Sequence, residues 1–228
     1  MWYLFVKKKT NKLLTALIKS KPQTNHCVKC FKEIEPNSLL NLAKRENILC
    51  NSCLNERKTH FQKFRIDGIK AYSIYDYDEY IQGVIYTFKV CGDYELHKLF
   101  LFPFEKEISL FFKGYKIVPI PSFKGDDIKR GFNHVFAIFK RLDLEILDIL
   151  EKTKDIKQVD VSGEKRKEIY KHLKVNKLEL VNSQKILIVD DIVTTGSTLK
   201  AAIKLIKEGK PKSIKILVIA KTINIKQN

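Results

Sequence analysis

The stretch ILIVDDIVTTGSTL, residues 186–199, joins two adjacent acids to a loop rich in hydroxyl groups. Residues 186–189 form an apolar run typical of a buried strand, and Asp190 and Asp191 follow it directly. In an open α/β sheet, ligands bind beyond the carboxyl ends of the strands. We therefore expect both carboxylates at the solvent end of a strand, beside a ligand.

The loop after the acids has the composition of an anion-binding site. Its members are Thr194, Thr195, Gly196, Ser197 and Thr198. They lead into a helical pattern, and the backbone N–H groups at a helix start attract phosphate together with the helix dipole. A glycine lets the backbone approach a ligand closely, and the hydroxyls add donors. This stretch has neither the Walker pattern nor the dinucleotide fingerprint.

A ribose 5-phosphate satisfies both halves of the stretch. Its phosphate suits the loop, and its 2′- and 3′-hydroxyls can donate hydrogen bonds to Asp190 and Asp191. The two carboxylates also suit Mg²⁺, which takes few protein ligands together with substrate oxygens. Two alternatives remain open. One is a helix cap beside acids that have no role in binding, and the other is an acid pair that accepts a phosphoryl group.

Four cysteines in two C-x2-C pairs form a second chemical cluster. They are Cys27, Cys30, Cys50 and Cys53, with 19 residues between the pairs. This spacing is typical of a tetrahedral zinc site, and four thiolates leave no open coordination position, so we predict a structural zinc. One alternative is disulfide bonding, which needs an oxidising compartment. Another is substitution of a cysteine ligand by His26 or His60.

Alternating strand and helix patterns follow the cysteine pairs. Strands are predicted over 69–75, 116–121, 185–191 and 213–222, and helices over 77–90, 93–102, 126–142 and 197–209. Such alternation predicts an α/β fold with a mostly parallel sheet flanked by helices. Residues 55–68 are predicted as a polar helical linker. The domain hypothesis is a basic extension over 1–26, a zinc module with linker over 27–62, and an α/β domain over 63–228.

The charge of the chain permits two interpretations. The 228 residues carry a formal net charge of +17, and 44% of them are hydrophobic, as in a globular protein. Clustered basic residues attract nucleic acid. However, only six of the 43 basic residues are Arg, and a Lys-rich composition can also reflect a bias of the source genome.

The amino-terminal segment contains no predicted membrane span. Its apolar runs, WYLFV and LLTALI, are far shorter than the roughly 20 residues that a transmembrane helix needs. A short amphipathic helix over 13–18, lying on the protein body or on a membrane surface, is compatible with the pattern. We expect a cytoplasmic protein without a transmembrane segment.

Residues 186–199 resemble the phosphoribosyl pyrophosphate (PRPP) motif of type I phosphoribosyltransferases. The wider sequence resembles the ComF/ComFC family of competence-associated proteins, in which a four-cysteine zinc module precedes a transferase-like domain. The other matching segments are FKVCGDYELHKLF (88–100), VPIPSFKGDDIKRGFNH (118–134) and KQVDVSGEKRKE (157–168). The resemblance covers about residues 27–225 and implies a type I phosphoribosyltransferase-like fold over 63–228.

The resemblance implies a role for each matching residue. Asp190 and Asp191 would hold the ribose hydroxyls and help to place Mg²⁺, and the loop 194–198 would bind the 5-phosphate. Pyrophosphate would face Ser122 and Arg130, and the segment 157–168 would be a mobile loop. The further residues implied in neutralising departing pyrophosphate are Lys165 and Arg166.

Three positions depart from the family pattern, and they affect the pyrophosphate half of the site. Asp126 stands where a basic residue is common, His134 where Gln is common, and Ile169 where Asn is common. The phosphate half is intact, so PRPP binding is a firmer expectation than turnover.

The family context implies a role in natural transformation, on or beside incoming single-stranded DNA. The implied partners are PRPP, single-stranded DNA and proteins of the competence machinery. An enzyme of this kind would displace pyrophosphate from C1 of PRPP with a nitrogen nucleophile. The alternatives are a non-catalytic PRPP-sensing adaptor and a nucleobase salvage phosphoribosyltransferase.

Overall fold

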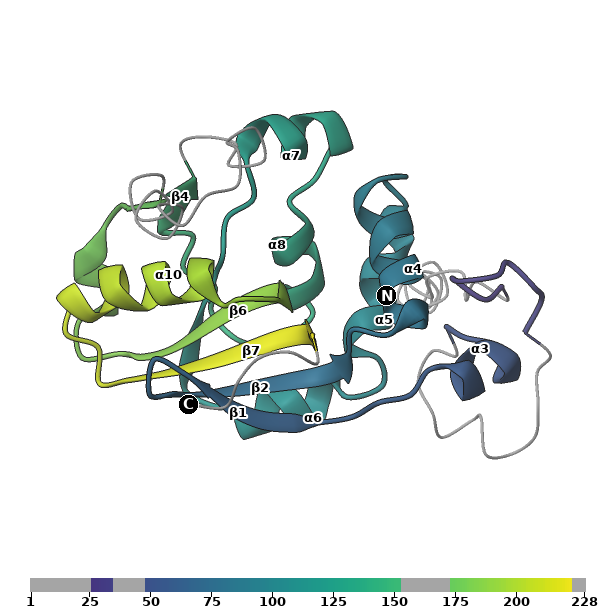
Figure 1. Cartoon of the computed structure of the whole chain (residues 1–228), viewed down its shortest axis with the longest axis horizontal. Helices are drawn as coiled ribbons and strands as arrows, with labels where there is room; N and C mark the ends of the chain where they lie inside the picture. Colours follow the sequence, from purple (N-terminus) through teal and green to yellow (C-terminus); the bar gives the residue numbers. More distant parts are fainter. Residues whose placement is uncertain (1–25, 35–47, 153–172, 223–228) are drawn as a thin grey trace, which may run out of the picture. The chain divides into compact units, whose positions relative to one another are not determined.

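The computed structural model describes residues 26–34, 48–152 and 173–222 (Figure 1). The chain divides into two compact units, one over residues 1–54 and the other over residues 55–228. In the first unit, a short antiparallel bridge between His26 and Glu33 closes the turn that carries the first cysteine pair. Helix α3 (Asn51–Glu56) carries the second pair's last member, Cys53.

A five-stranded sheet with the order β1-β2-β7-β6-β3 forms the centre of the second unit. Its strands are β1 (Gln62–Ile66), β2 (Ile69–Asp76), β3 (Tyr115–Pro119), β6 (Lys185–Val193) and β7 (Ser213–Lys221). The strands β2, β7, β6 and β3 are parallel, and only the edge strand β1 is antiparallel. The predicted α/β class with a mostly parallel sheet is confirmed, and β6 lies between two parallel neighbours.

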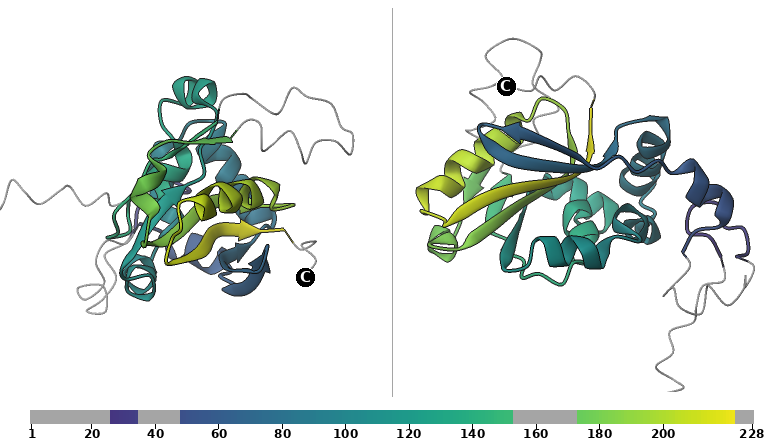
Figure 2. Two further views of the ribbon diagram at one scale, coloured as in Figure 1. Left: turned by 90° about the vertical axis from the view of Figure 1, so that its left-hand side faces the viewer. Right: turned by 90° about the horizontal axis from the view of Figure 1, so that it is seen from below.

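Helices cover both faces of this sheet, as Figures 1 and 2 show. Helix α10 packs against one face, over a core that includes Ile186, Ile188 and Ile216. The alternate residues of β6, Leu187 and Val189, are fully buried on the other side, where α8 contacts β6 and β3. The helices are α4 (Glu79–Lys89), α5 (His97–Leu101), α6 (Glu105–Phe111), α7 (Lys124–Arg130), α8 (His134–Phe139) and α10 (Ser197–Glu208).

Smaller elements complete the described part of the chain. They are the 3₁₀ turns η1 (Tyr94–Leu96) and η3 (Leu178–Val181), and the antiparallel pair β4 (Leu150–Lys152) and β5 (Leu173–Val175). Among the helices that the structure describes, none has the length and apolarity needed to cross a membrane.

The predicted helical linker over 55–68 is wrong beyond Glu56, where α3 ends, because residues 62–66 form β1 and residues 67–68 form the turn into β2. Phe64 and Ile66 are buried and alternate with exposed Lys63 and Arg65, so the period is that of a strand. The turn follows at Asp67 and Gly68, which have φ values of 51° and 75°. Asp-Gly at such a turn is a strong hairpin signal, which outweighs the polar composition of the segment.

The single helix predicted over 126–142 is also wrong. Helix α7 ends at Arg130, and Gly131 follows in the left-handed region with a φ of 86°. Helix α8 then starts after Asn133, whose side chain accepts a hydrogen bond of 2.8 Å from the Phe136 backbone N–H. The glycine stop and the new cap turn the chain, so Arg130 and His134 face each other across a corner.

Candidate functional site

Asp190 and Asp191 lie inside the central strand β6, which continues to Val193. Their neighbours stay paired with β7, with Asp190 opposite Val218 and Ile192 opposite Ala220. Because side chains alternate along a strand, the two aspartates start on opposite faces of the sheet. Asp191 is only 6% exposed, so the expectation that both acids lie at a solvent-exposed strand end is wrong.

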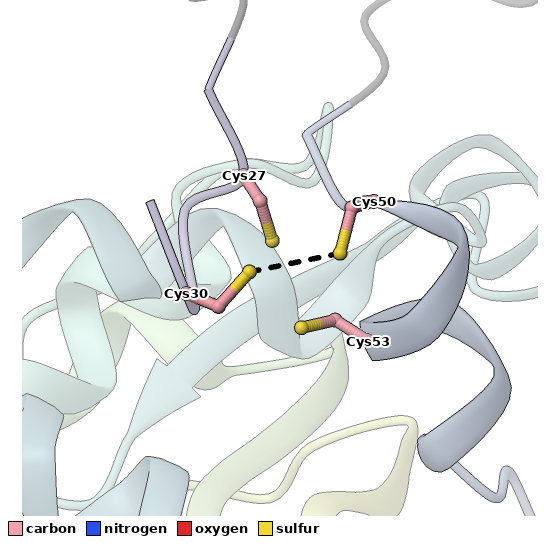
Figure 3. A group of neighbouring side chains, drawn as sticks. All are labelled: Cys27, Cys30, Cys50 and Cys53. Carbon is pink, nitrogen blue, oxygen red and sulfur yellow. Dashed lines mark hydrogen bonds between the residues drawn. The ribbon is translucent and has the colours of Figure 1, made fainter. Parts of the chain in front are cut away.

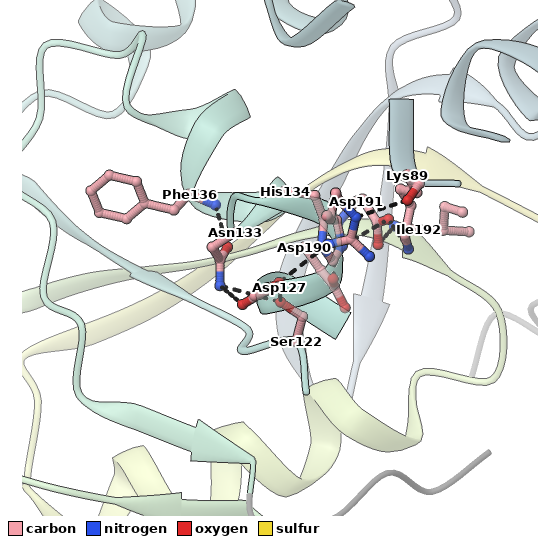
Figure 4. Close-up of polar contacts among 10 residues, drawn as sticks. Lys89, Ser122, Asp127, Asn133, His134, Phe136, Asp190, Asp191 and Ile192 are labelled. Atoms are coloured by element: carbon pink, nitrogen blue, oxygen red, sulfur yellow. Dashed lines mark hydrogen bonds and ion pairs between the residues drawn. The ribbon is translucent and has the colours of Figure 1, made fainter. Parts of the chain in front are cut away.

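Asp191 lies in a buried ion-pair network, shown in Figure 4. Its Oδ2 accepts a hydrogen bond of 2.6 Å from Lys89 Nζ, and the same oxygen is 3.3 Å from His134 Nε2. The backbone N–H of Ile192 donates to Oδ1 at 2.7 Å. Lys89 is the last residue of α4 and His134 is the first of α8, so this carboxylate joins two helices to β6.

The two aspartates have opposite electrostatic environments. Burial raises the pKa of Asp190 well above its ordinary value, and the neighbouring charge of Asp191 raises this pKa further. For Asp191, burial also acts to raise the pKa, but Lys89 and then His134 outweigh it and hold the pKa well below its ordinary value. One carboxyl group is therefore firmly ionised, and its neighbour retains a proton to higher pH.

Arg130 extends the network beyond His134. Its Nη1 lies 3.1 Å from His134 Nδ1 and 3.2 Å from Asp127 Oδ1, and its Nε donates to the Lys89 carbonyl at 2.8 Å. An arginine has donors only, so His134 Nδ1 must accept, and its proton lies on Nε2 facing Asp191. The Arg130 side chain is 9% exposed, and these donors face protein groups.

Ser122 is joined to this network through Asp127. The Ser122 hydroxyl donates to Asp127 Oδ1, and Asn133 Nδ2 donates to Asp127 Oδ2 at 3.0 Å and to Ser122 Oγ at 3.3 Å. The structure therefore brings Ser122 and Arg130, both predicted site residues, onto one carboxylate. The other two predicted pyrophosphate residues, Lys165 and Arg166, lie outside the described residues.

The hydroxyl-rich loop lies directly after β6 and runs into α10. Thr194 and Thr195 are exposed, and Ser197 and Thr198 are half-buried. Thr195 Oγ1 and Ser197 Oγ are 2.9 Å apart. Helix α10 has Gly196 as its N-cap, and the backbone N–H of Ser197, the first helical residue, donates to Thr195 Oγ1 at 3.4 Å. One hydroxyl of the loop therefore takes part in capping the helix, and the other N–H groups of the first turn can donate to an anion.

The four predicted metal ligands converge in the first unit (Figure 3). Their Sγ atoms all lie within 4.8 Å of one another, and Cys30 Sγ is 3.6 Å from Cys50 Sγ. A tetrahedral Zn²⁺ with bonds of about 2.3 Å places its sulfurs about 3.8 Å apart. The cluster can therefore hold a metal such as zinc.

The cysteine thiols themselves point to a cationic ligand. Burial acts to raise the pKa of Cys27, but backbone N–H groups of Cys50, Cys30 and Lys29 lower this pKa to about 7. Burial and the neighbouring thiols raise the pKa of Cys53 well above its ordinary value. Four clustered thiols cannot all ionise alone, whereas a divalent cation stabilises all four thiolates.

Two comparisons with known proteins decide the family. Residues 129–224 match the phosphoribosyl transferase domain. Over 149 residues, the chain is 30% identical to the competence protein ComFC of Streptococcus pneumoniae. With the four-cysteine cluster, these matches are decisive. The chain is a ComF/ComFC-type protein. The alignment covers 65% of this chain and 66% of the relative, just under two thirds of the relative's length.

Solved phosphoribosyltransferases share a weaker likeness with this ComF/ComFC-type chain. A hypoxanthine phosphoribosyltransferase of Staphylococcus aureus is 15% identical, with a TM-score of 0.36, over 58% of this chain and 66% of that one. A hypoxanthine-guanine phosphoribosyltransferase of Bacillus anthracis is 17% identical, with a TM-score of 0.36, over 55% of this chain and 68% of that one.

Sequence reasoning did not identify Lys89 and Asp127 as site residues, and noted His134 only as a departure from the family pattern. Lys89 lies 102 residues from Asp191 along the chain, so no local spacing links them. The available signal was its position in FKVCGDYELHKLF, one of the segments that resemble the ComF/ComFC family.

We expect Asp190→Asn and Asp191→Asn to change stability in opposite directions. The raised folded-state pKa of Asp190 means that its ionisation opposes folding above about pH 4, so Asp190→Asn should raise the free energy of unfolding at pH 7. The lowered pKa of Asp191 means that its charge stabilises the fold above about pH 4. Asp191→Asn should therefore lower the free energy of unfolding at pH 7, and urea unfolding measures both.

Lys89→Met should act like Asp191→Asn and cost about 1–3 kcal/mol, less than a fully buried pair because Lys89 is partly exposed. All three effects should shrink when unfolding is measured below about pH 4, where the aspartates of the unfolded chain are protonated. Equal signs for the two aspartate variants at pH 7 would contradict this assignment of charges.

Proposed function

We propose that this ComF/ComFC-type protein binds PRPP with Mg²⁺ at the carboxyl end of β6. One observation supports this most strongly: the paired acids of the central parallel strand run directly into a hydroxyl-lined helix start. PRPP carries a 5-phosphate for the loop 194–198 and two ribose hydroxyls for the acids. The phosphoribosyl transferase domain match over 129–224 includes this whole region.

The contacts of the two aspartates favour different roles in this proposal. Both oxygens of Asp191 already accept hydrogen bonds, from Lys89 and His134 on one side and from Ile192 on the other. We therefore assign the direct ribose or Mg²⁺ contact first to Asp190, with Asp191 supplying fixed negative charge beside it. Mg²⁺, when bound, would neutralise charge on the pyrophosphate and take its remaining ligands from PRPP and water.

The pyrophosphate half of the site is proposed to depend on Ser122 and the backbone after β3. Arg130 is buried against Asp127, His134 and the Lys89 carbonyl, so we assign it to positioning this corner. Lys165 and Arg166 stay a proposal from the family resemblance alone. Pyrophosphate release in the presence of PRPP, Mg²⁺ and nitrogen nucleophiles separates an enzyme from a PRPP-sensing adaptor.

The biological part of the proposal is a role in natural transformation. The relative in Streptococcus pneumoniae is named a competence protein, and the present chain has a net charge of +17. A strongly basic protein gains affinity for nucleic acid by releasing counterions. We propose that it acts in the cytoplasm on or beside incoming single-stranded DNA, with proteins of the competence machinery.

PRPP affinity should fall when the acids are neutralised. Each charge-assisted hydrogen bond contributes about 1.5–3 kcal/mol, so Asp190→Asn should weaken PRPP binding at least about tenfold, and Asp190→Asn with Asp191→Asn by up to about a thousandfold. Calorimetric titration with Mg²⁺ present measures this. Asp143→Asn, which removes an exposed carboxylate outside the site, is the matched control. Unchanged affinity in the double variant would refute the ribose assignment.

The same titration should show proton release. A ribose hydroxyl or Mg²⁺ favours the ionised form of Asp190, whose pKa is raised in the free protein. Wild-type affinity should therefore rise with pH across that raised pKa, and buffers of different ionisation enthalpy should reveal the released proton. In Asp190→Asn, the only remaining pH dependence of the affinity should come from the ionisation of PRPP itself. An identical pH profile in wild type and variant would contradict the role of Asp190.

We also propose that the four-cysteine cluster holds one structural zinc. The supporting observation is the convergence of four thiols at distances that suit tetrahedral coordination. Purified protein should contain about one zinc per chain, and Cys27→Ser or Cys50→Ser should lose it and destabilise the first unit. Cys91→Ser is the control, since Cys91 is exposed and outside the cluster. Metal analysis without zinc in the wild type would refute the proposal.

A further inference from the structure

A row of cations crosses the face of the sheet opposite α10, near the amino ends of the parallel strands. Arg65 of β1 pairs directly with Lys70 of β2. Lys215 of β7 lies beside Lys70 in this row. The two strands are parallel, and their next residues, Ala71 and Ile216, are register partners. Lys63 lies opposite Tyr72 on the same face. Three basic side chains on adjacent strands therefore lie side by side.

Aromatic rings lie among these cations. Lys215 Nζ is 4.8 Å from the ring centroid of Tyr115 and 5.1 Å from that of Phe111. The rings of Tyr72 and Phe111 are 5.3 Å apart, edge to face. Phe111, at the end of α6, is 57% exposed. Figure 1 shows α6 and α10 on opposite sides of the sheet. We name this surface the basic sheet face, and its members are Lys63, Arg65, Lys70, Tyr72, Phe111, Tyr115, Lys185 and Lys215.

The cations that β1, β2 and β7 contribute to the basic sheet face repel one another, and these three strands supply little acidic compensation. Like charges directly opposite on neighbouring strands destabilise a sheet. The strands β1 and β2 contain one acid, Asp76, which lies at the far end of β2 in contact with His60 and Gln62. Strand β7 contains none, and α6 adds Glu107 one turn before Phe111. An anionic partner would relieve this repulsion.

We propose that the basic sheet face binds single-stranded nucleic acid, with phosphates on the cations and a base stacked on the exposed ring of Phe111. Single-stranded binding surfaces combine a cationic track with aromatic platforms, and only an unpaired strand can present its bases to such rings. The strand spacing of about 4.8 Å places long, flexible Lys and Arg side chains along a continuous track. The proposal rests on the proposed role with single-stranded DNA and adds the location.

This location separates DNA binding from PRPP binding within one sheet. Asp190 and Asp191 lie near the carboxyl end of β6, whereas Lys185 starts that strand and contacts the Tyr115 ring at 5.9 Å. Substitutions on the basic sheet face should therefore leave PRPP affinity unchanged. That independence distinguishes a failure of this inference from a failure of the PRPP proposal.

The first test compares two charge-matched variants of the full-length protein. Fluorescence anisotropy with a labelled oligo(dT) of about 30 nucleotides, at about 50 mM salt, should show at least about a tenfold weaker affinity for Arg65→Ala with Lys70→Ala. The slope of log affinity against log salt concentration should become shallower by about 1.4, because each of the two lost phosphate contacts contributes about 0.7. The control, Lys200→Ala with Lys204→Ala on the exposed side of α10, should bind like the wild type.

The second test separates base stacking from charge. Phe111→Leu keeps an apolar side chain but removes the ring, so affinity for oligo(dT) should fall by about fivefold or more. Binding of inorganic polyphosphate, which has no bases, should not change. Melting temperature and PRPP affinity, measured for every variant, exclude a general loss of folding.

Each other result overturns part of this assignment. If Arg65→Ala with Lys70→Ala binds oligo(dT) as tightly as the wild type, the basic sheet face is not the binding site, and single-stranded DNA binds elsewhere on the protein. An equal loss of affinity in the α10 control variant shows that the overall charge of the protein, and not a defined surface, drives binding. If Phe111→Leu weakens polyphosphate binding as much as oligo(dT) binding, base stacking on Phe111 is excluded. Failure of the wild type itself to bind oligo(dT) overturns both this inference and the proposed DNA role.

Discussion

The buried contact between Lys89 and Asp191 is the interaction on which the site depends. A carboxylate with 6% exposure is costly to bury unless it is paired, and removing one partner of such a pair leaves an uncompensated charge. Lys89 ends α4, so its ammonium group ties that helix to the central strand. Arg130 then donates to the Lys89 carbonyl, which joins the corner between α7 and α8 to the same point.

This pairing also gives two identical residues different chemistry. Asp190 and Asp191 are adjacent, but a strand directs neighbouring side chains to opposite faces. Only Asp191 meets the cation from α4, so its pKa is lowered, and its negative charge in turn raises the pKa of Asp190. Enzymes commonly separate the roles of two carboxyl groups through their environments in this way. In our proposal, Asp190, which can be protonated, contacts the ribose, and the ionised Asp191 supplies a fixed negative charge beside it.

Charge is organised differently in each part of this ComF/ComFC-type protein. In the first unit, four thiols converge on one point and favour a cation. Near the carboxyl end of β6, the acids precede by a few residues a helix start that favours an anion, which suits a ligand with both hydroxyls and phosphate. On the basic sheet face, Arg65, Lys70 and Lys215 lie side by side and favour a polyanion.

Local patterns in the sequence were sufficient where the physical cause is local. The apolar run of β6, the helix over 197–208 and the spacing of the four cysteines each predicted what the structure shows, because periodicity and ligand spacing act within a few residues. The pattern failed over 55–68, where polar residues of an edge strand suggested a helix. It failed again over 126–142, where Gly131 stops one helix and Asn133 caps the next.

The sequence by itself determined the α/β class, the acid pair beside its hydroxyl loop, and a four-cysteine cluster that can hold a metal. Only the tertiary structure decided that Lys89, 102 residues away, pairs with Asp191 and divides the two acids into one ionised and one protonatable group. The cationic row of β1, β2 and β7 likewise exists only through strand register. The reason is physical: Coulomb interactions and burial depend on distance in space, which the order of residues along the chain does not specify.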